Sequence, residues 1–227
     1  MLALGAWVAL DTSALLQLMV SQPLVAGWLA GLVVGAPGAG FTVGLLLQLL
    51  WGRSLPMGTA SIPFMGPAAV AAGAVAGWTV TDAWRFTGRL PIPDAASLAT
   101  CLVLALVLGE SGRVMVDVIG RRRGVPIRRA EAAAAKSHPA GVALANLSGA
   151  VPTALLGGGL VAAGLIAGVV GLELLAGIPR AEGHWLALVL FGLGLGRTVS
   201  LVAPGRLGWG WVAVTGAIIL LLGKVDG

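Results

Sequence analysis

The sequence has few charged residues and a single cysteine, and both shortages restrict what the chain can be. Only 10% of its 227 residues are charged, whereas 58% are hydrophobic. A soluble domain needs polar side chains to cover its surface, so this composition excludes a large soluble fold and favours a membrane protein. The one cysteine, Cys101, lies within an apolar run, which leaves no disulfide framework and no cysteine metal cluster.

Motifs for catalysis are also missing from the sequence. His138 and His184 lie in polar loops, without a serine, cysteine or carboxylate in the arrangement of a catalytic triad or metal site. There is no phosphate-binding loop of the Walker type, so the chain does not hydrolyse ATP itself. We therefore expect no catalytic residues, no metal and no cofactor in this chain.

Apolar runs and glycine are abundant, and their lengths predict the fold class. An α-helix rises about 1.5 Å per residue and needs roughly 20 residues to cross the hydrocarbon core of a membrane. Segments 62–80 and 95–119 meet this requirement and are predicted to span. Many of the 36 glycines recur every fourth residue, which allows helices to approach closely. The sequence thus predicts an all-α integral membrane protein, a multi-span helical bundle that forms a single domain over 1–227.

Two apolar runs are too short to cross a membrane alone. Residues 24–36 and 39–51 have thirteen residues each, and Pro37-Gly38 separates them. They form either one long, Pro-kinked span or a re-entrant hairpin of two half-helices. Proline removes a helical donor and glycine favours a turn, so the hairpin is preferred.

A second interruption lies in the later run 140–176. Asn146, Ser148, Pro152 and three consecutive glycines at 157–159 fall within it. These residues predict a broken helix or a second hairpin. A broken element in each half of a chain is typical of transporters built from inverted repeats.

The positive charge is concentrated in the middle of the chain. Six cations fall within residues 120–138, namely Arg121, Arg122, Arg123, Arg128, Arg129 and Lys136. Between two membrane spans such a segment is interpreted as a basic cytoplasmic loop under the positive-inside rule, next to anionic lipid headgroups. We prefer this interpretation to a nucleic-acid-binding patch and expect no nucleic-acid partner.

Polar side chains within apolar runs require an explanation, because a central charge costs about 2.5–3.5 kcal/mol on the insertion scale. Glu110, Arg113 and Asp117 share one helix face and are predicted to form an ion cluster with one another. Gln48 lies four residues after Gly44, so an amide and a helix groove share a face. Its donors and acceptor suit sugar hydroxyls, and the alternative is a hydrogen bond between helices.

The N-terminal third resembles a known family. The run LDTSALLQLMVSQPLVAGWLAGLVVGAP, followed by GLLLQLLWGRSLPMGTASIP, is similar to the enzyme IIC subunit (EIIC) of the mannose/sorbose-type phosphotransferase system (PTS) sugar transporters. In that family an Asp precedes a Ser-Arg-Pro-Leu-Val-Ala-Gly type motif, and a Leu-Glu/Gln-Leu-Leu-Trp segment leads into a Gly-Ala-x-x-Pro-Pro-Asp type turn. The matching positions are Asp11, Ser21, Pro23, Leu24, Val25, Ala26, Gly27, Gln48, Leu49, Leu50, Trp51, Gly58 and Pro63.

The resemblance implies a permease subunit that translocates a sugar while partner subunits phosphorylate it. It implies a multi-pass protein of the bacterial plasma membrane (the cell inner membrane), with an enzyme IID membrane subunit and cytoplasmic IIA and IIB phosphocarriers as partners. It also implies a homo-oligomer, often a trimer. The alternatives are a non-transporting structural or docking subunit and a PTS-independent small-solute transporter of the same fold.

Polarity in an apolar context, together with the motif match, selects the candidate substrate-binding residues. They are Asp11, Gln17, Gln22, Gln48, Arg53, Ser54 and Thr59. The sequence departs from the family pattern near this path, since Gln22 stands where an Arg is usual and Phe64 replaces the Asp after the proline. Both changes remove charge, which is the reason for keeping the docking-subunit alternative.

Overall fold

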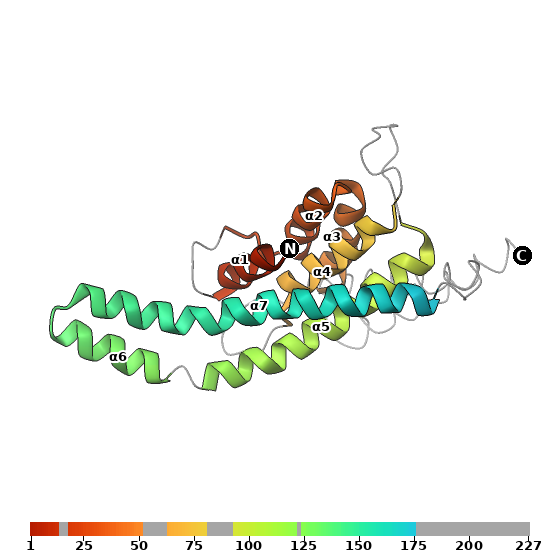
Figure 1. Cartoon of the computed structure of the whole chain (residues 1–227). Coiled ribbons are helices and arrows are strands. Elements are labelled where there is room, and N and C mark those ends of the chain that lie inside the picture. Colours follow the sequence, from red (N-terminus) through yellow and green to blue (C-terminus); the bar gives the residue numbers. More distant parts are fainter. Residues whose placement is uncertain (14–17, 52–62, 81–92, 122–123, 176–227) are drawn as a thin grey trace, which may run out of the picture.

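The computed structural model describes residues 1–13, 18–51, 63–80, 93–121 and 124–175. These residues form helices and contain no strand (Figure 1). The prediction of an all-α fold is therefore confirmed. The helices in chain order are α1 (Leu2–Ser13), α2 (Pro23–Val34), α3 (Pro37–Trp51), α4 (Met65–Trp78), α5 (Ala95–Arg121), α6 (Gly124–Ala135) and α7 (Pro139–Leu175).

Helices α2 and α3 form a hairpin. Gly35 ends α2 in the left-handed conformation, with φ 83°, which glycine adopts without steric cost. The Ala36 N–H donates to the Gly31 carbonyl at 2.7 Å, and Pro37 begins α3 with a backbone angle already suited to a helix. The two helices then pack against each other (Figure 1). The hairpin prediction is confirmed, and the single kinked span is excluded.

Glycines bring the backbones of this hairpin and of α4 into direct contact. A Cβ atom on Gly27 would lie 2.8 Å from the carbonyl oxygen of Gly40 and 3.0 Å from the Cα of Gly44. A Cβ on Gly73 of α4 would lie 2.7 Å from the carbonyl oxygen of Gly27. Such close approach requires the absence of side chains, as expected from the glycine spacing.

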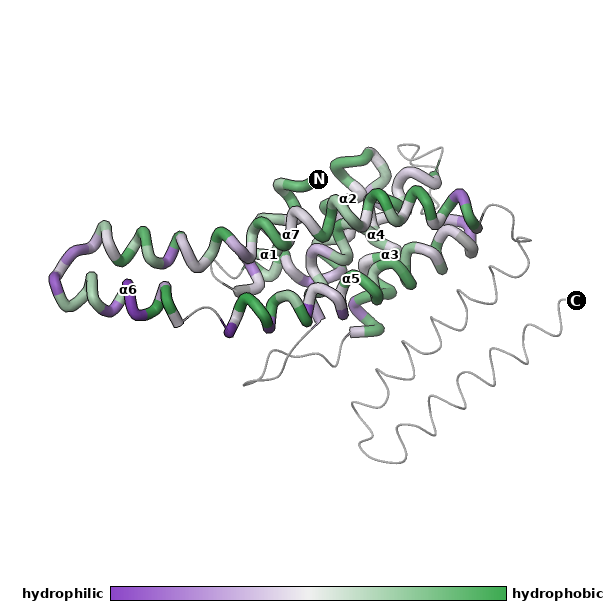
Figure 2. The backbone as a smooth tube through the Cα atoms, turned by 60° about the horizontal axis from the view of Figure 1, so that its bottom comes forward, coloured by the Kyte–Doolittle hydropathy of each residue, from purple (hydrophilic) through white to green (hydrophobic). Residues whose placement is uncertain are grey.

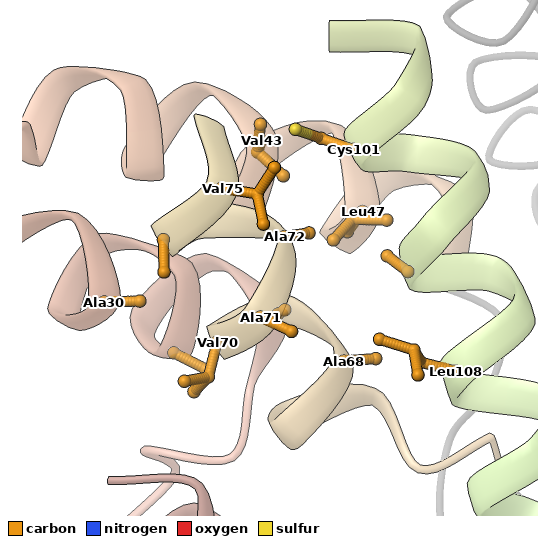
Figure 3. Packing of buried hydrophobic residues seen from close by; sticks show 14 of the residues in the cluster. Ala30, Val43, Leu47, Ala68, Val70, Ala71, Ala72, Val75, Cys101 and Leu108 are labelled. Carbon is orange, nitrogen blue, oxygen red and sulfur yellow. The ribbon is translucent and has the colours of Figure 1, made fainter. Parts of the chain in front are cut away.

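Helix α4 occupies the centre of the bundle, and the predicted span 62–80 is wrong in length. The helix has 14 residues, so it is about 21 Å long and shorter than the hydrocarbon core. Residues Gly66 to Gly77 are all buried, because alanine and glycine let neighbouring helices surround α4. Figure 3 shows its side chains, including Ala71 and Val75, within the apolar core.

Helix α7 runs unbroken for 37 residues, which contradicts the predicted break in 140–176. Pro152 lies inside the helix without ending it. Of the three glycines that suggested a break, Gly157 is a packing position, whereas nothing lies within 4 Å of a Cβ on Gly159. A Cβ on Gly164 would lie 2.6 Å from the side chains of both Ala71 in α4 and Leu108 in α5, and Gly157 contacts Ala9 of α1. Contacts with three helices hold α7 continuous despite its local sequence.

By length and composition, one helix of the described residues qualifies to cross a membrane, over Pro139–Leu174. Helix α5 has 27 residues, about 40 Å, which agrees with the length predicted for 95–119.

The basic segment 120–138 forms a helix over residues 124–135 rather than an irregular loop. Helix α6 packs antiparallel along the first part of α7, and the two form an arm that extends beyond the bundle (Figure 1). A Cβ on Gly141 would lie 2.9 Å from Ala133, and Pro126 lies beside Gly149. Small residues thus allow α6 and α7 to pack closely in the arm. Hydrophilic and hydrophobic residues alternate along it in Figure 2.

Candidate functional site

Asp11 joins the end of α1 to the segment that leads into α2. Its side chain is 4% exposed. One carboxylate oxygen accepts the Leu18 N–H at 2.6 Å, and the other accepts the Ser21 N–H at 2.9 Å. Hydrogen bonds from backbone N–H groups to a carboxylate are charge-assisted and stabilise the buried charge. Asp11 therefore determines the position of residues 18–21.

Met19 lies between these two bonds in an unusual conformation. Its φ angle is 60°, in the left-handed region that non-glycine residues rarely adopt. Its side chain is 66% exposed, so packing of the side chain does not explain the conformation. The two bonds to Asp11, on either side of Met19, provide the constraint that holds it.

Gln48 connects α3 to the beginning of α2. Its Oε1 accepts the Leu24 N–H at 3.4 Å, in the first turn of α2. The first N–H groups of a helix have no partner within the helix, and the N-cap residue Gln22 makes no side-chain capping bond. The half-buried amide of Gln48 therefore takes the place of a cap. A hydrogen bond from Gln48 to another helix was one of the two expectations from the sequence.

Gln22 lies at the same point with an exposed side chain. Its N–H donates to the Met19 carbonyl at 3.1 Å, and its carbonyl accepts the Ala26 N–H at 2.9 Å. Three of the candidate residues, Asp11, Gln22 and Gln48, thus come together around residues 18–24. The other four, Gln17, Arg53, Ser54 and Thr59, lie outside the described residues.

Trp51 and Phe64, on either side of segment 52–62, meet at α5. A Cβ on Gly109 would lie 2.8 Å from the ring of Trp51, the last residue of α3. The Phe64 N–H donates to the carbonyl of the same Gly109 at 2.9 Å. Gly109 was not identified from the sequence, although it lies next to Glu110, one of the polar residues that the apolar runs singled out.

Phe64 is a core residue. It is 4% exposed, and a Cβ on Gly112 of α5 would lie 2.7 Å from the Phe64 Cβ and 2.9 Å from Leu160 of α7. The position at which the family turn usually carries an acid is therefore filled here by a buried aromatic residue against Gly112 of α5.

The predicted ion cluster on α5 is confirmed for one pair. The Arg113 Nε lies 2.8 Å from the Glu110 Oε2, with the two side chains 40% and 51% exposed. A pair this exposed contributes little to stability where water reaches it. In the part of the chain that the structure describes, no group of three His, Cys, Asp or Glu side chains is placed to hold a metal ion.

The described residues form an all-α bundle with large exposed apolar side chains and one helix that is long and apolar enough to cross a membrane. Residues 1–194 match the family described as the PTS system sorbose-specific IIC component. The chain belongs to this family. It is therefore a sugar permease component of the PTS, located in the cell membrane, that works with other PTS components. No curated protein and no solved structure matches the chain.

Proposed function

We propose that the sugar passes beside the start of α2 and is bound there by Gln22 and Gln48, with Gln17, Arg53, Ser54 and Thr59 completing the polar path. The observation that carries this proposal is the meeting of Asp11, Gln22 and Gln48 around residues 18–24. These residues come from three separate helical regions of an otherwise apolar chain. An amide both donates and accepts hydrogen bonds, as a sugar hydroxyl does.

Within this proposal Asp11 is a positioning residue. Both of its oxygens already accept backbone N–H groups, so it sets the conformation of residues 18–21. Gln48 is bound to Leu24 by a long hydrogen bond of 3.4 Å, which a competing hydroxyl can replace at small cost. Gln22, two residues before Leu24, adds an exposed amide. The two glutamines give the path neutral hydrogen-bonding groups rather than charges.

The wider role follows from the family. We propose that transport is coupled to phosphorylation of the sugar by IIA and IIB phosphocarriers. We also propose that the chain forms a homo-oligomer in the bacterial plasma membrane and binds a IID membrane subunit there. The segment 120–138 faces the cytoplasm in this proposal, because Arg121, Arg128 and Arg129 follow the positive-inside rule. Labelling Lys136→Cys with a membrane-impermeant thiol reagent in intact and in broken cells tests this orientation.

Sugar uptake by cells that express the chain with its partner subunits tests the binding path. Gln48→Leu and Gln22→Leu are expected to lower uptake at equal amounts of protein in the membrane. Thr42→Val is the matched control, because it removes a polar group from the same helix as Gln48, where the Thr42 hydroxyl only donates to the Gly38 carbonyl at 3.0 Å. Unchanged uptake in both glutamine variants would overturn the assignment, and no uptake by the native complex would favour a docking subunit.

A further inference from the structure

The outward face of α7 carries an apolar stripe that is longer than a membrane is thick. Its side chains are large, exposed and spaced on one side of the helix, from Leu144 to Leu174. Leu144 and Ile166 are equally exposed, at 69%, although they lie 22 residues and therefore about 33 Å apart along the axis. The stripe consists of Leu144, Leu147, Val151, Leu155, Ile166, Val170 and Leu174.

The membrane covers only part of this stripe. The apolar helix Pro139–Leu174 has 36 residues and is about 54 Å long, whereas the hydrocarbon core is about 30 Å thick. An average tilt of about 20° extends the buried length to only about 32 Å, or roughly 21 residues. About fifteen residues of the helix must therefore lie outside the hydrocarbon.

Charged residues show which end lies outside. Helix α6 packs along α7 from Gly141 to Gly149, and it carries Arg128 and Arg129 with exposed side chains. Exposed arginines without a carboxylate partner are excluded from the hydrocarbon, so α7 enters it only after Gly149. Arg113 of α5 is next to Gly112 and so level with Leu160, but it is paired with Glu110. At the far end Glu173 is also exposed. The 23 residues between Gly149 and Glu173 are close to the roughly 21 that cross the core.

Leu144 then lies on the aqueous side of the membrane. If the hydrocarbon begins near Thr153, Leu144 is nine residues, or about 14 Å, beyond its edge. The headgroup layer is about 5–7 Å thick on each side, so lipid does not reach this leucine. Leu147 is six residues, or about 9 Å, beyond the edge, so it also lies outside the headgroup layer. The two leucines form an apolar patch in water, which marks an interaction site.

We propose that Leu144 and Leu147 dock an amphipathic helix of another protein, whose apolar face is flanked by carboxylates. Charge selects this partner. The exposed residues of α6 and of the turn that joins it to α7 carry three cations and one anion, namely Arg128, Arg129 and Lys136 against Glu131. An acidic helix complements this charge, whereas a second copy of the chain would bring the same cations.

By charge, residues 176–227 of this chain are no better a partner for the patch than a second copy. Residues 176–227 contain four cations and two anions, namely Arg180, Arg197, Arg206 and Lys224 against Glu182 and Asp226. Their net charge therefore has the same sign as that of the arm. The inference depends on the length of α7 and its membrane placement and is independent of the sugar path.

Spin labels on the full chain in lipid nanodiscs test where the patch lies. With Cys101→Ala as background, labels are placed at Leu144→Cys and at the equally exposed Ile166→Cys. We expect the label at 144 to be reached by a water-soluble nickel complex and the label at 166 by oxygen dissolved in the bilayer. Lipid exposure at 144, dipolar coupling between copies, or shielding from both reagents would each overturn the proposal.

Two synthetic helical peptides then test the chemistry of the partner. Both carry the same leucine stripe, flanked by glutamates in one and by lysines in the other. The acidic peptide is expected to bind and to protect the label at 144 but not the label at 166. The lysine peptide is expected to bind at least about tenfold more weakly, and equal binding of the two would contradict the proposal.

Variants of the arm provide the last test. Leu147→Asp is expected to weaken binding of the acidic peptide by about tenfold or more. Because that variant alters an apolar surface, a second one changes charge alone. Arg128→Glu combined with Arg129→Glu is expected to reverse the preference between the two peptides. A preference that is unchanged in the charge-reversed chain would exclude an acidic partner at this site.

Discussion

The carboxylate of Asp11 accepts the backbone N–H of Ser21 at 2.9 Å, which joins the end of α1 to the residue two before α2. Its second oxygen holds Leu18, and Met19 lies between the two in a left-handed conformation. The buried carboxylate of Asp11 thus binds backbone N–H groups. Gln48 of α3 accepts the N–H of Leu24, three residues after Ser21. The conformation of residues 18–24 and the relative position of α1, α2 and α3 therefore depend on each other.

Asp11→Asn is expected to destabilise the chain. An asparagine keeps one acceptor, but its NH₂ group faces a backbone N–H and leaves that donor without a partner, which costs about 1–3 kcal/mol. Thermal unfolding of the purified chain measures the change. Thr12→Ala is the control, because Thr12 is exposed and bonds only within its own helix, to the Val8 carbonyl at 3.2 Å. Native stability with loss of uptake would show that the carboxylate contacts the sugar itself.

Replacements of Gln48 separate its capping role from its role in binding. Gln48→Leu removes the acceptor for the Leu24 N–H and is expected to cost about 0.5–1.5 kcal/mol. Gln48→Glu keeps the acceptor and places a negative charge at the start of α2, where the helix dipole favours it. Hydrogen exchange at the Leu24 amide should therefore accelerate in the leucine variant only. Equal exchange in both variants would argue against the cap.

The sequence predicts local turns in this fold better than distant contacts. Pro37-Gly38 and two runs of thirteen residues were enough to predict the hairpin, because the signal lies within the segment itself. Pro152 and the adjacent glycines suggested a break for the same local reason, yet α7 continues. Its stability comes from contacts with α1, α4 and α5, such as that of Gly157 with Ala9, which sequence spacing does not reveal.

The candidate site shows the same limit. Polarity in an apolar run identified Asp11 and Gln48, but their partners are backbone N–H groups, which every residue except proline has. No pattern of side chains could therefore indicate that both residues act on the start of α2. Phe64 was noticed only as a missing acid, since its packing against Gly112 joins residues far apart in the chain.

Alanine at Gly27 tests the contact between the hairpin and its neighbours. The added methyl group would lie 2.8 Å from the Gly40 carbonyl oxygen, and backbone on both sides leaves no flexible atom to move. We expect a loss of about 1–3 kcal/mol in the free energy of unfolding. Gly159→Ala is the matched control, because nothing lies within 4 Å of its Cβ position. It should gain about 0.5–1 kcal/mol from helix propensity, and a similar loss in both variants would contradict the packing.

Phe64→Asp restores the acid that the family turn usually carries, and it decides whether this position faces a polar path or the core. Phe64 is 4% exposed and packs against Gly112, where Leu160 also lies, so an aspartate there leaves a cavity and a carboxyl group in apolar surroundings. A phenylalanine truncated in a core costs about 3–5 kcal/mol, and the buried carboxyl adds to this. Phe64→Leu keeps an apolar side chain and should lose far less. Thermal unfolding of the two variants provides the measurement. An aspartate variant as stable as the native chain, with altered sugar uptake, would place residue 64 on the polar path and contradict its position in the core.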